Sequence, residues 1–323
     1  MNKSALLTLP EAWKDSLGKA VGMLEDRGIH VDRVWSDTGL PKEKLIGLLQ
    51  GKQAHMMSLD VLDRDVIERC PDLKVIAKHG IGLDNIDIAA ATTRKIPVCN
   101  TPGSNCHAVA DLTLGLLLCA CRKIGEADAL VRQGRLIQIM GTELHAKAIG
   151  VVGFGAIGRQ VALRAKGFGM RVLAYDKFMD HTFCQANDVA PAEFDEILRT
   201  CDFITLHLPL TKETKGLIGP DALARMKKGA VLINVSRGGV VDEDACAQAL
   251  MDGHLAAAGF DVFSKEPPDI ADKLFKAPNV VLTTHMAGCT RESIARSAEM
   301  AAQNIIDILD GKRLPNVVNQ EIY

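Results

Sequence analysis

The sequence predicts an α/β protein built from two doubly wound, parallel-sheet domains, one of them inserted into the other. Short apolar runs of strand composition alternate with helical stretches along the whole chain, which is typical of parallel βα units. The glycine-rich turn Gly153-Phe154-Gly155-Ala156-Ile157-Gly158 lies near the middle of the 323 residues, with about 150 residues ahead of it. A domain that begins there interrupts one that began earlier.

The N-terminal part of the chain predicts a small parallel sheet. Its expected strands are Ala5–Leu9, Val31–Trp35, His55–Leu59, Leu73–Lys78 and Pro97–Asn100. The segment His79-Gly80-Ile81-Gly82 directly follows the fourth of these strands, where backbone N–H groups are suited to holding a carboxylate. Thr101-Pro102-Gly103 then breaks the chain, and Asn105 to Lys123 has the composition of a long apolar helix, with Ser104 as its candidate N-cap.

The second part of the chain continues the βα rhythm around the glycine-rich turn. Its expected strands are Ala148–Val152, Arg171–Tyr175, Phe203–Leu206, Val231–Asn234, Ala256–Asp261 and Val280–Thr284. A helix over Arg291–Leu309 is expected to return the chain to the first domain. We therefore expect a smaller, flavodoxin-like substrate domain from residues 1–102 and 290–323, and a Rossmann domain from residues 103–289. Two crossings between domains favour a hinge beside a substrate cleft.

The glycine-rich turn has the spacing of a dinucleotide-binding turn between a buried strand and a helix. Gly153 is expected to allow the tight turn, Gly155 to let the backbone approach a pyrophosphate, and Gly158 to let helix and strand pack closely. Asp176 ends the next expected strand, where its carboxylate can accept hydrogen bonds from ribose hydroxyls and repel a 2′-phosphate. This pattern predicts NAD as the cofactor, while the neighbouring Lys177 leaves some use of NADP open.

Composition limits the class of protein. The 38 basic and 40 acidic residues give a formal net charge of −2 with no basic block, which disfavours nucleic-acid binding. Because the sequence shows neither a signal-peptide pattern nor an apolar run long enough to cross a bilayer, we expect a soluble cytoplasmic protein without membrane partners. The nine cysteines lack paired CxxC spacing and are expected to be reduced, with Cys289 the one to watch for oxidation.

Three polar residues follow successive late strands: Arg237, Glu266 and His285. The carboxyl ends of these strands face the cofactor crevice of a doubly wound sheet, so the side chains can converge. An arginine can bind a carboxylate in two places, and a histidine can donate a proton to a developing alkoxide. Together they predict hydride transfer between a nicotinamide and a 2-oxoacid, with Glu266 expected to hydrogen-bond the other ring nitrogen of His285 and raise its pKa.

Two other histidines are weaker candidates. His79 is a rival proton donor, although its position before Gly80 favours a backbone role, and His207 is expected to line an adenosine pocket or to pack structurally. No cluster has the spacing of metal ligands, so no metal site is predicted.

With these motifs in place, nearly the whole chain resembles the D-isomer-specific 2-hydroxyacid dehydrogenase family, the group that includes phosphoglycerate dehydrogenases and hydroxypyruvate reductases. The matching segments are Gly80–Asp87, Asn100–Gly103, Gly153–Gly158, His207–Thr211, Asn234–Gly239, Gly259–Phe263 with Glu266-Pro267, and His285–Gly288.

The resemblance implies a catalytic triad of Arg237, Glu266 and His285, with His285 as the proton donor. It implies that the backbone of Gly80, Ile81 and Gly82 holds the substrate carboxylate, together with Arg237 and His285. Members of the family typically form two-fold dimers through their cofactor domains, which would bury the apolar face of Asn105 to Lys123. The expected NAD-contacting residues are Gly153, Gly155, Ala156, Ile157, Gly158, Asp176, His207, Leu208, Pro209, Val235, Ser236, Arg237, Asp261, His285, Ala287 and Gly288, with Asp261 on the nicotinamide carboxamide.

Departures from the family pattern bear on the substrate. Met57 stands where some phosphoglycerate dehydrogenases carry a phosphate-binding arginine, and the chain ends at Tyr323 without the serine-sensing domain of the long forms. The leading hypothesis is therefore an NAD-dependent dehydrogenase that interconverts a small D-2-hydroxyacid and its 2-oxoacid. D-3-phosphoglycerate dehydrogenase is the alternative within the enzyme class. A formate-dehydrogenase-like enzyme is a weaker hypothesis. Outside the class of enzymes, the alternative is a non-catalytic NAD-sensing interaction protein.

Overall fold

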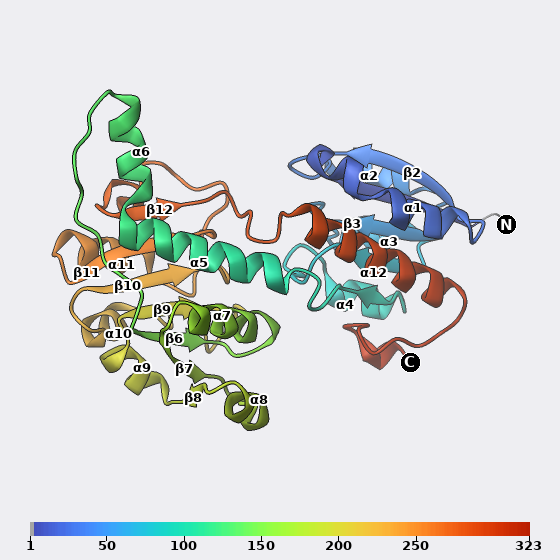
Figure 1. Cartoon of the computed structure of the whole chain (residues 1–323). Coiled ribbons are helices and arrows are strands. Elements are labelled where there is room, and N and C mark those ends of the chain that lie inside the picture. The colour runs from blue at the N-terminus through green and yellow to red at the C-terminus, as the bar shows by residue number, and fades with distance from the viewer. Residues whose placement is uncertain (1–2) are drawn as a thin grey trace. The chain divides into compact units, whose positions relative to one another are not determined.

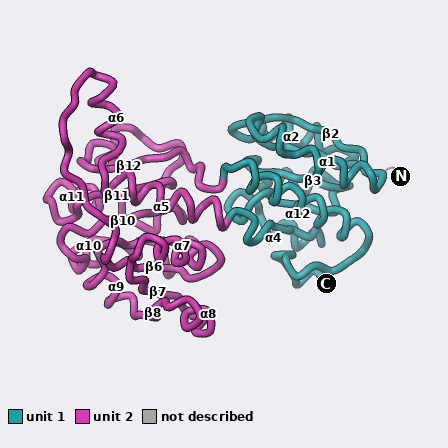
Figure 2. Tube along the Cα trace, viewed as in Figure 1, with its two compact units in different colours: residues 1–105, 289–323 teal, residues 106–288 magenta. Residues whose placement is uncertain are grey.

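The computed structural model describes residues 3–323, which form two compact units. Unit 1 consists of residues 1–105 and 289–323, of which residues 1 and 2 lie outside the described part, and unit 2 consists of residues 106–288 (Figure 2). Unit 2 is thus inserted in the sequence of unit 1. The first boundary lies three residues after the expected one, and the second lies one residue before it. Substrate binding by unit 1 stays a prediction.

Unit 1 is built on a parallel sheet with the strand order β2-β1-β3-β4-β5 (Figure 1). This is the flavodoxin-like order. The strands are β1 Ser4–Leu9, β2 His30–Trp35, β3 Ala54–Met57, β4 Val75–Lys78 and β5 Val98–Cys99. Nearly every residue of β1, β3 and β4 is buried, as expected for a parallel sheet covered on both faces.

Two separate cores cover the faces of this sheet. On one face, α1 and α12 pack together, and Ala298, Ala301 and Ile305 of α12 are wholly buried. On the other face, α2, α3 and α4 contribute Leu45, Val66 and other apolar side chains. The helices of unit 1 are η1 Glu11–Ser16, α1 Gly18–Glu25, α2 Lys42–Leu49, α3 Arg64–Glu68, α4 Ile88–Thr93, α12 Arg291–Leu309 and η3 Gln320–Ile322.

Unit 2 contains a larger parallel sheet with the order β12-β11-β10-β9-β6-β7-β8. Read from β8 to β12, this is the Rossmann order with one added strand. The strands are β6 Ala148–Val152, β7 Arg171–Tyr175, β8 Ala190–Pro191, β9 Phe203–Leu206, β10 Ala230–Asn234, β11 Leu255–Phe260 and β12 Val280–Leu282. The order reverses between β6 and β9, so a crevice forms at the carboxyl ends of these strands, where doubly wound sheets bind ligands.

Helices cover both faces of the unit 2 sheet. The long helix α5 packs on α7 and on strands β10 and β11, so Val109, Leu116 and Leu117 lie in the unit's own core. These residues need no second copy for their burial, and burial of the partly exposed Leu112 and Leu118 in a dimer interface stays a prediction. The helices of unit 2 are α5 Cys106–Arg122, α6 Ile124–Arg132, α7 Ala156–Gly167, α8 His181–Ala186, α9 Phe194–Thr200, α10 Pro220–Arg225, α11 Glu243–Met251 and η2 Lys273–Lys276.

None of the helices within residues 3–323 combines the length and the apolar character needed to cross a membrane.

Candidate active site

The glycine-rich turn joins β6 to α7, and two of its glycines are required by close backbone packing. Gly153 has a φ of 94°, and a Cβ there would lie 2.7 Å from the carbonyl carbon of His207. A Cβ on Gly158 would lie 2.1 Å from the carbonyl oxygen of Gly153. Gly155 differs, because a Cβ there would meet no atom within 4 Å. The turn thus has open space beside Gly155 at the N-terminus of α7, which fits the approach of a pyrophosphate.

Asp176 follows β7 and is tied to this turn. Its Oδ2 accepts a hydrogen bond from the Phe154 N–H (2.7 Å), and its Oδ1 accepts one from the Phe178 N–H (2.9 Å). The carboxylate is thereby fixed beside the turn, and its remaining lone pairs can still accept bonds from ribose hydroxyls.

His207 forms the wall opposite the turn through its backbone. Its Nε2 pairs with the Thr205 hydroxyl (3.0 Å), and its buried Nδ1 has no partner within residues 3–323. Burial lowers the pKa of His207 to about 3, so the ring is neutral. An orphaned ring nitrogen beside the turn fits a cofactor pocket better than a purely structural histidine, which would be expected to be fully paired.

His285 and Glu266 form a direct pair after β12 and β11. His285 Nδ1 lies 2.7 Å from Glu266 Oε2, and Glu266 Oε1 accepts the Phe263 N–H (3.1 Å). Because the carboxylate can only accept a hydrogen bond, Nδ1 carries a proton. Nε2 is therefore the nitrogen that can exchange a proton with a substrate. Nε2 has no hydrogen-bond partner among the described residues, and half of the imidazole side chain is exposed. The pair therefore presents one exposed ring nitrogen to a substrate.

Each partner shifts the pKa of the other. The hydrogen bond to Glu266 raises the pKa of His285, outweighing the opposing effect of burial. Burial opposes ionisation of Glu266, but its bonds from His285 and Phe263 keep its pKa lowered. The Arg237 charge lowers the pKa of both groups, so Arg237 belongs to the same electrostatic site.

The turn after β10 carries Arg237 and packs against the loop that carries Glu266. A Cβ on Gly238 would lie 1.8 Å from the carbonyl oxygen of Phe263, a separation that no side chain permits. Arg237 is half-buried, and its Nη1 donates to the Ser236 carbonyl (2.8 Å). The absence of a side chain at Gly238 thus allows the two loops to meet.

Asp261 holds the loop that carries His285. Its Oδ1 accepts bonds from the Thr283 hydroxyl (2.6 Å) and the Met286 N–H (2.8 Å), and its Oδ2 accepts the Ala287 N–H (2.9 Å). His285 has a φ of 54°, an unfavourable conformation for histidine that the following N–H bonds to Asp261 restrain. Asp261 is 0% exposed, and its expected contact with the nicotinamide carboxamide stays a prediction.

We expect Asp261→Asn to loosen the His285 loop, because an amide NH2 cannot accept the bonds that one carboxylate oxygen accepts now. Losing one such bond predicts a fall in kcat of about tenfold, with faster hydrogen exchange in residues 283–287. Asp242→Asn is the matched control, since Asp242 only caps α11 through the Ala245 N–H. Unchanged exchange and kcat in Asp261→Asn would show that the loop does not depend on this carboxylate.

The remaining expected cofactor residues lie on the same strand ends and helix start. Ala156 and Ile157 form the first turn of α7, while Val235 and Ser236 are buried after β10. Leu208, Pro209, Ala287 and Gly288 follow β9 and β12, with Ala287 buried.

Sequence reasoning missed the role of Asn234. Its Oδ1 accepts the Ser236 N–H (3.1 Å) and hydroxyl (2.8 Å), and its Nδ2 donates to the Arg237 carbonyl (3.1 Å). An asparagine at the end of a strand is a signal for such a side-chain-stabilised turn.

The Gly80–Gly82 loop belongs to unit 1 and is only partly available for a carboxylate. The Gly80 N–H already donates to the Thr101 hydroxyl (2.9 Å), and Gly80 has a φ of 123°. In this structure the Gly80 N–H is thus occupied, so the N–H groups of Ile81 and Gly82 are the available donors, and substrate binding by this loop stays a prediction.

His79 is a structural residue. It is buried, its Nε2 pairs with the Ile294 carbonyl (3.0 Å), and its ring packs on Trp13 at a centroid distance of 4.7 Å. Burial lowers the pKa of His79 to about 4, so the ring is neutral near pH 7 and its one N–H is used by the Ile294 carbonyl.

The comparisons with known proteins identify the family. Residues 114–287, more than half of the chain, match the model of the D-isomer-specific 2-hydroxyacid dehydrogenase NAD-binding domain. Glyoxylate reductases of Korarchaeum cryptofilum and Thermococcus litoralis are 41% and 42% identical, each over 90% of both chains. A D-3-phosphoglycerate dehydrogenase of Archaeoglobus fulgidus is 40% identical over 93% of this chain but only 57% of its own length.

Solved structures agree in fold over nearly the whole chain. The TT0316 protein of Thermus thermophilus has a TM-score of 0.87 at 36% identity, covering 97% of this chain and 99% of that one. A D-lactate dehydrogenase of Aquifex aeolicus, solved with NAD and lactic acid, has a TM-score of 0.80 at 28% identity and covers 95% and 96%.

The fold and the strand-end site define a nicotinamide-dependent dehydrogenase. The chain belongs to the D-isomer-specific 2-hydroxyacid dehydrogenase family. It is an NAD-dependent enzyme that interconverts a D-2-hydroxyacid and its 2-oxoacid.

Proposed function

We propose that this enzyme reduces glyoxylate, or a 2-oxoacid of similar size, with NADH. The two glyoxylate reductases that match 90% of the chain support this substrate class. Met57, at the position where a phosphate-binding arginine would favour phosphoglycerate chemistry, is 0% exposed and packs in the core of unit 1. The position thus offers neither a charge nor an exposed surface to a substrate phosphate.

The observation that carries the mechanism is the His285–Glu266 pair with its exposed Nε2. Bound NADH supplies the hydride that reduces the carbonyl carbon. His285 donates the Nε2 proton to the carbonyl oxygen, and Glu266 stabilises the imidazolium before that transfer. Arg237 orients the substrate carboxylate and polarises the carbonyl. In the oxidation direction, neutral His285 accepts the hydroxyl proton.

For the cofactor, we propose that the backbone around Gly155 to Ile157 holds the pyrophosphate and that Asp176 binds the adenine ribose. The open space at Gly155 and the position of the Asp176 carboxylate beside the turn support these roles. The carboxylate disfavours a 2′-phosphate by charge repulsion. We propose that Ile81 and Gly82 donate backbone N–H groups to the substrate carboxylate.

The test is an NADH-oxidation screen with glyoxylate, hydroxypyruvate, pyruvate, 3-phosphohydroxypyruvate and longer 2-oxoacids. We expect the highest kcat/KM with the smallest unphosphorylated acids. A preference for 3-phosphohydroxypyruvate would instead support the phosphoglycerate alternative, which the 40% identity to that enzyme keeps open. Tight NADH binding without turnover of any of these acids would favour the NAD-sensing alternative.

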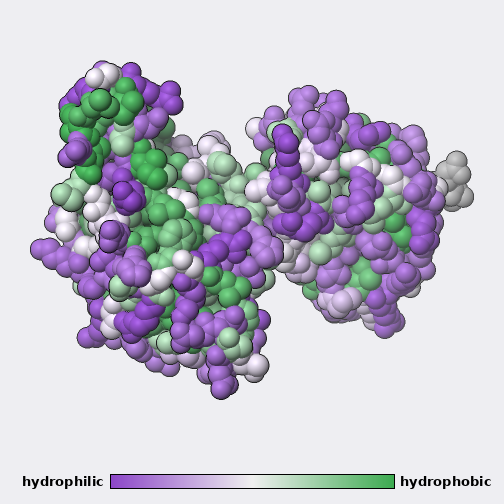
Figure 3. Space-filling model, in the orientation of Figure 1, coloured by the Kyte–Doolittle hydropathy of each residue, from purple (hydrophilic) through white to green (hydrophobic). Residues whose placement is uncertain are grey.

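We also propose a cytoplasmic homodimer formed through unit 2. The segment 124–140, here called the arm, contains α6, which has no buried residue. Its apolar side chains Leu136 and Met140 are 89% and 88% exposed, and Figure 3 shows apolar surface gathered there. Such exposure favours burial against a second copy. Sedimentation velocity should give a dimer whose dissociation is promoted by Leu136→Glu with Met140→Glu.

A further inference from the structure

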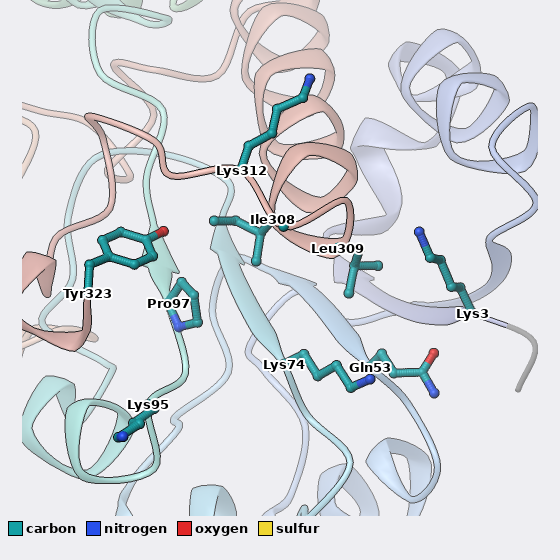
Figure 4. Close-up of a pocket in the computed structure, with 10 residues that line it drawn as sticks. Lys3, Gln53, Lys74, Lys95, Pro97, Ile308, Leu309, Lys312 and Tyr323 are labelled. Carbon is teal, nitrogen blue, oxygen red and sulfur yellow. The ribbon is translucent and has the colours of Figure 1, made fainter.

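Unit 1 contains a pocket at the amino ends of its strands, at the opposite end of the sheet from the Gly80–Gly82 loop. Its polar lining includes Lys3, Gln53, Lys74, Lys95, Lys312 and Tyr323 (Figure 4). Lys3, Gln53 and Lys74 directly precede β1, β3 and β4, whereas Gly80 follows the carboxyl end of β4. Its volume of about 580 Å³ is typical of a small-molecule site.

The lining carries four lysines and no acidic residue. Two of the lysines are neutralised by neighbours outside the lining, because Lys3 pairs with Asp310 (2.9 Å) and Lys312 with Asp307 (2.7 Å). The ammonium groups of Lys74 and Lys95 have neither an ion pair nor a hydrogen bond within residues 3–323. Lys74 and Lys95 are therefore the two lysines of the lining without an ion pair among the described residues.

The backbone at Lys95 is unfavourable for a lysine. Lys95 has a φ of 51° directly after the end of α4, a position where glycine or asparagine is preferred because a Cβ is strained there. Backbone bonds from the Lys95 N–H to the Thr92 carbonyl (2.9 Å) and from the Ile96 N–H to the Ala91 carbonyl (2.9 Å) enforce this conformation. A lysine thus occupies a position at which the backbone conformation alone favours glycine or asparagine.

Gln53 adds a fixed neutral donor to the charged lining. Only 8% of the residue is exposed, and its Oε1 accepts the Ser4 N–H (3.0 Å), which fixes the amide. The backbone carbonyl oxygen of Gln53 accepts a hydrogen bond from the Lys74 backbone N–H (2.8 Å). The Nε2 group has no hydrogen-bond partner among the described residues. This nitrogen is not among the buried unpartnered atoms of the described residues, so it is accessible and can donate to a ligand or to water.

The rest of the lining is apolar and firmly held. Figure 4 shows Tyr323 and Pro97 on one side and Gln53 and Lys3 on the other, with Ile308 and Leu309 between them. The segment before Tyr323 is anchored by Asn319, which is 0% exposed and bonds the Ile96 carbonyl (2.9 Å) and the Val98 N–H (2.9 Å). In Figure 4 the Lys74 side chain extends toward Gln53, whereas the Lys95 side chain points away from it, so contact of both ammonium groups with one phosphate requires Lys95 to change its rotamer.

From these features we propose that the pocket binds a small phosphorylated molecule with an apolar or aromatic body. Lysines bind phosphate as point charges, whereas planar carboxylates are best matched by the guanidinium fork, and the lining contains no arginine. Lys74 and Lys95 hold the phosphate, Gln53 Nε2 donates to one of its oxygens, and Tyr323 packs on the organic part. The site is separate from the NAD and substrate sites.

The test uses phenyl phosphate, inorganic pyrophosphate and benzoate as probes in isothermal titration calorimetry. The protein is first saturated with NADH, so that the cofactor site is occupied. We expect both phosphate probes to bind with a Kd below about 1 mM at low salt, more weakly as salt is raised, and benzoate to bind at least about tenfold more weakly.

Two double variants decide the site. Lys74→Gln with Lys95→Gln should weaken phenyl phosphate binding by about tenfold or more, since two charge-assisted contacts are lost. Lys14→Gln with Lys44→Gln removes the same charge from exposed positions of unit 1 outside the pocket and should leave the Kd unchanged. The proposal is overturned if the wild-type protein gives no heat with either phosphate probe, or if both double variants bind alike.

Discussion

Replacing His285 with asparagine is expected to reduce the turnover of 2-oxoacids by about 10²- to 10⁴-fold while leaving the affinity for NADH nearly unchanged. In this half-exposed imidazole, Nδ1 pairs with Glu266 and Nε2 is left for the substrate. Asparagine is the right replacement because it tolerates the left-handed backbone at this position, where φ is 54°. The variant thus removes the proton donor without adding backbone strain.

The pH profile separates the roles of the two residues. Because Glu266 raises the pKa of His285, the imidazole stays protonated to a higher pH than an ordinary histidine. The rate of reduction requires that proton, so kcat/KM should be highest below the raised pKa and fall as pH rises through it. In Glu266→Gln the fall should occur at lower pH, and the oxidation rate, which needs neutral His285, should rise earlier.

The matched control is His181→Asn, an exposed histidine of α8. It should keep the turnover and the pH profile of the wild type. NADH affinity is measured by fluorescence titration for each variant. If His285→Asn retained wild-type turnover, or if Glu266→Gln left the pH profile in place, the proposed proton donor would have to be abandoned.

Strands buried on both faces could be predicted from the sequence almost to the residue. β6, β7 and β9 have the expected bounds, since their apolar, β-branched composition leaves no polar face that competes for another structure. The two-residue strand β8 was missed because it is exposed and contains Pro191, which cannot donate to a neighbouring strand. α6 was missed although Ile124, Ala127 and Val131 recur at helical spacing, so this signal was available in the sequence.

Residue types at strand ends predicted which side chains form the candidate site, but not how their loops are held. The Glu266–His285 hydrogen bond was expected from chemistry alone and is present. By contrast, the three bonds that Asp261 accepts from its own chain were not expected, and its contact with the cofactor stays a prediction. Gly80 likewise donates its N–H to Thr101. Such intramolecular partners depend on three-dimensional loop paths, which no local pattern encodes.

Gly158→Ala is expected to damage both the fold of unit 2 and its binding of NADH. The added Cβ would lie 2.1 Å from the Gly153 carbonyl oxygen and 3.1 Å from Val151 Cγ1, so α7 or the glycine-rich turn must shift. Overpacking of this kind costs about 1–3 kcal/mol, which should appear as a lower Tm. The shift displaces the backbone that holds the pyrophosphate, so NADH affinity should fall by about tenfold or more.

Gly155→Ala and Gly47→Ala separate these two effects, because a Cβ at either position meets no atom within 4 Å. Gly155→Ala should keep the wild-type Tm yet weaken NADH binding, since its methyl group occupies the space that the pyrophosphate needs. Gly47→Ala, within α2 of unit 1, should raise stability by about 0.5–1 kcal/mol and leave NADH binding unchanged. Wild-type NADH affinity in both Gly155→Ala and Gly158→Ala would mean that the turn after β6 does not bind the cofactor.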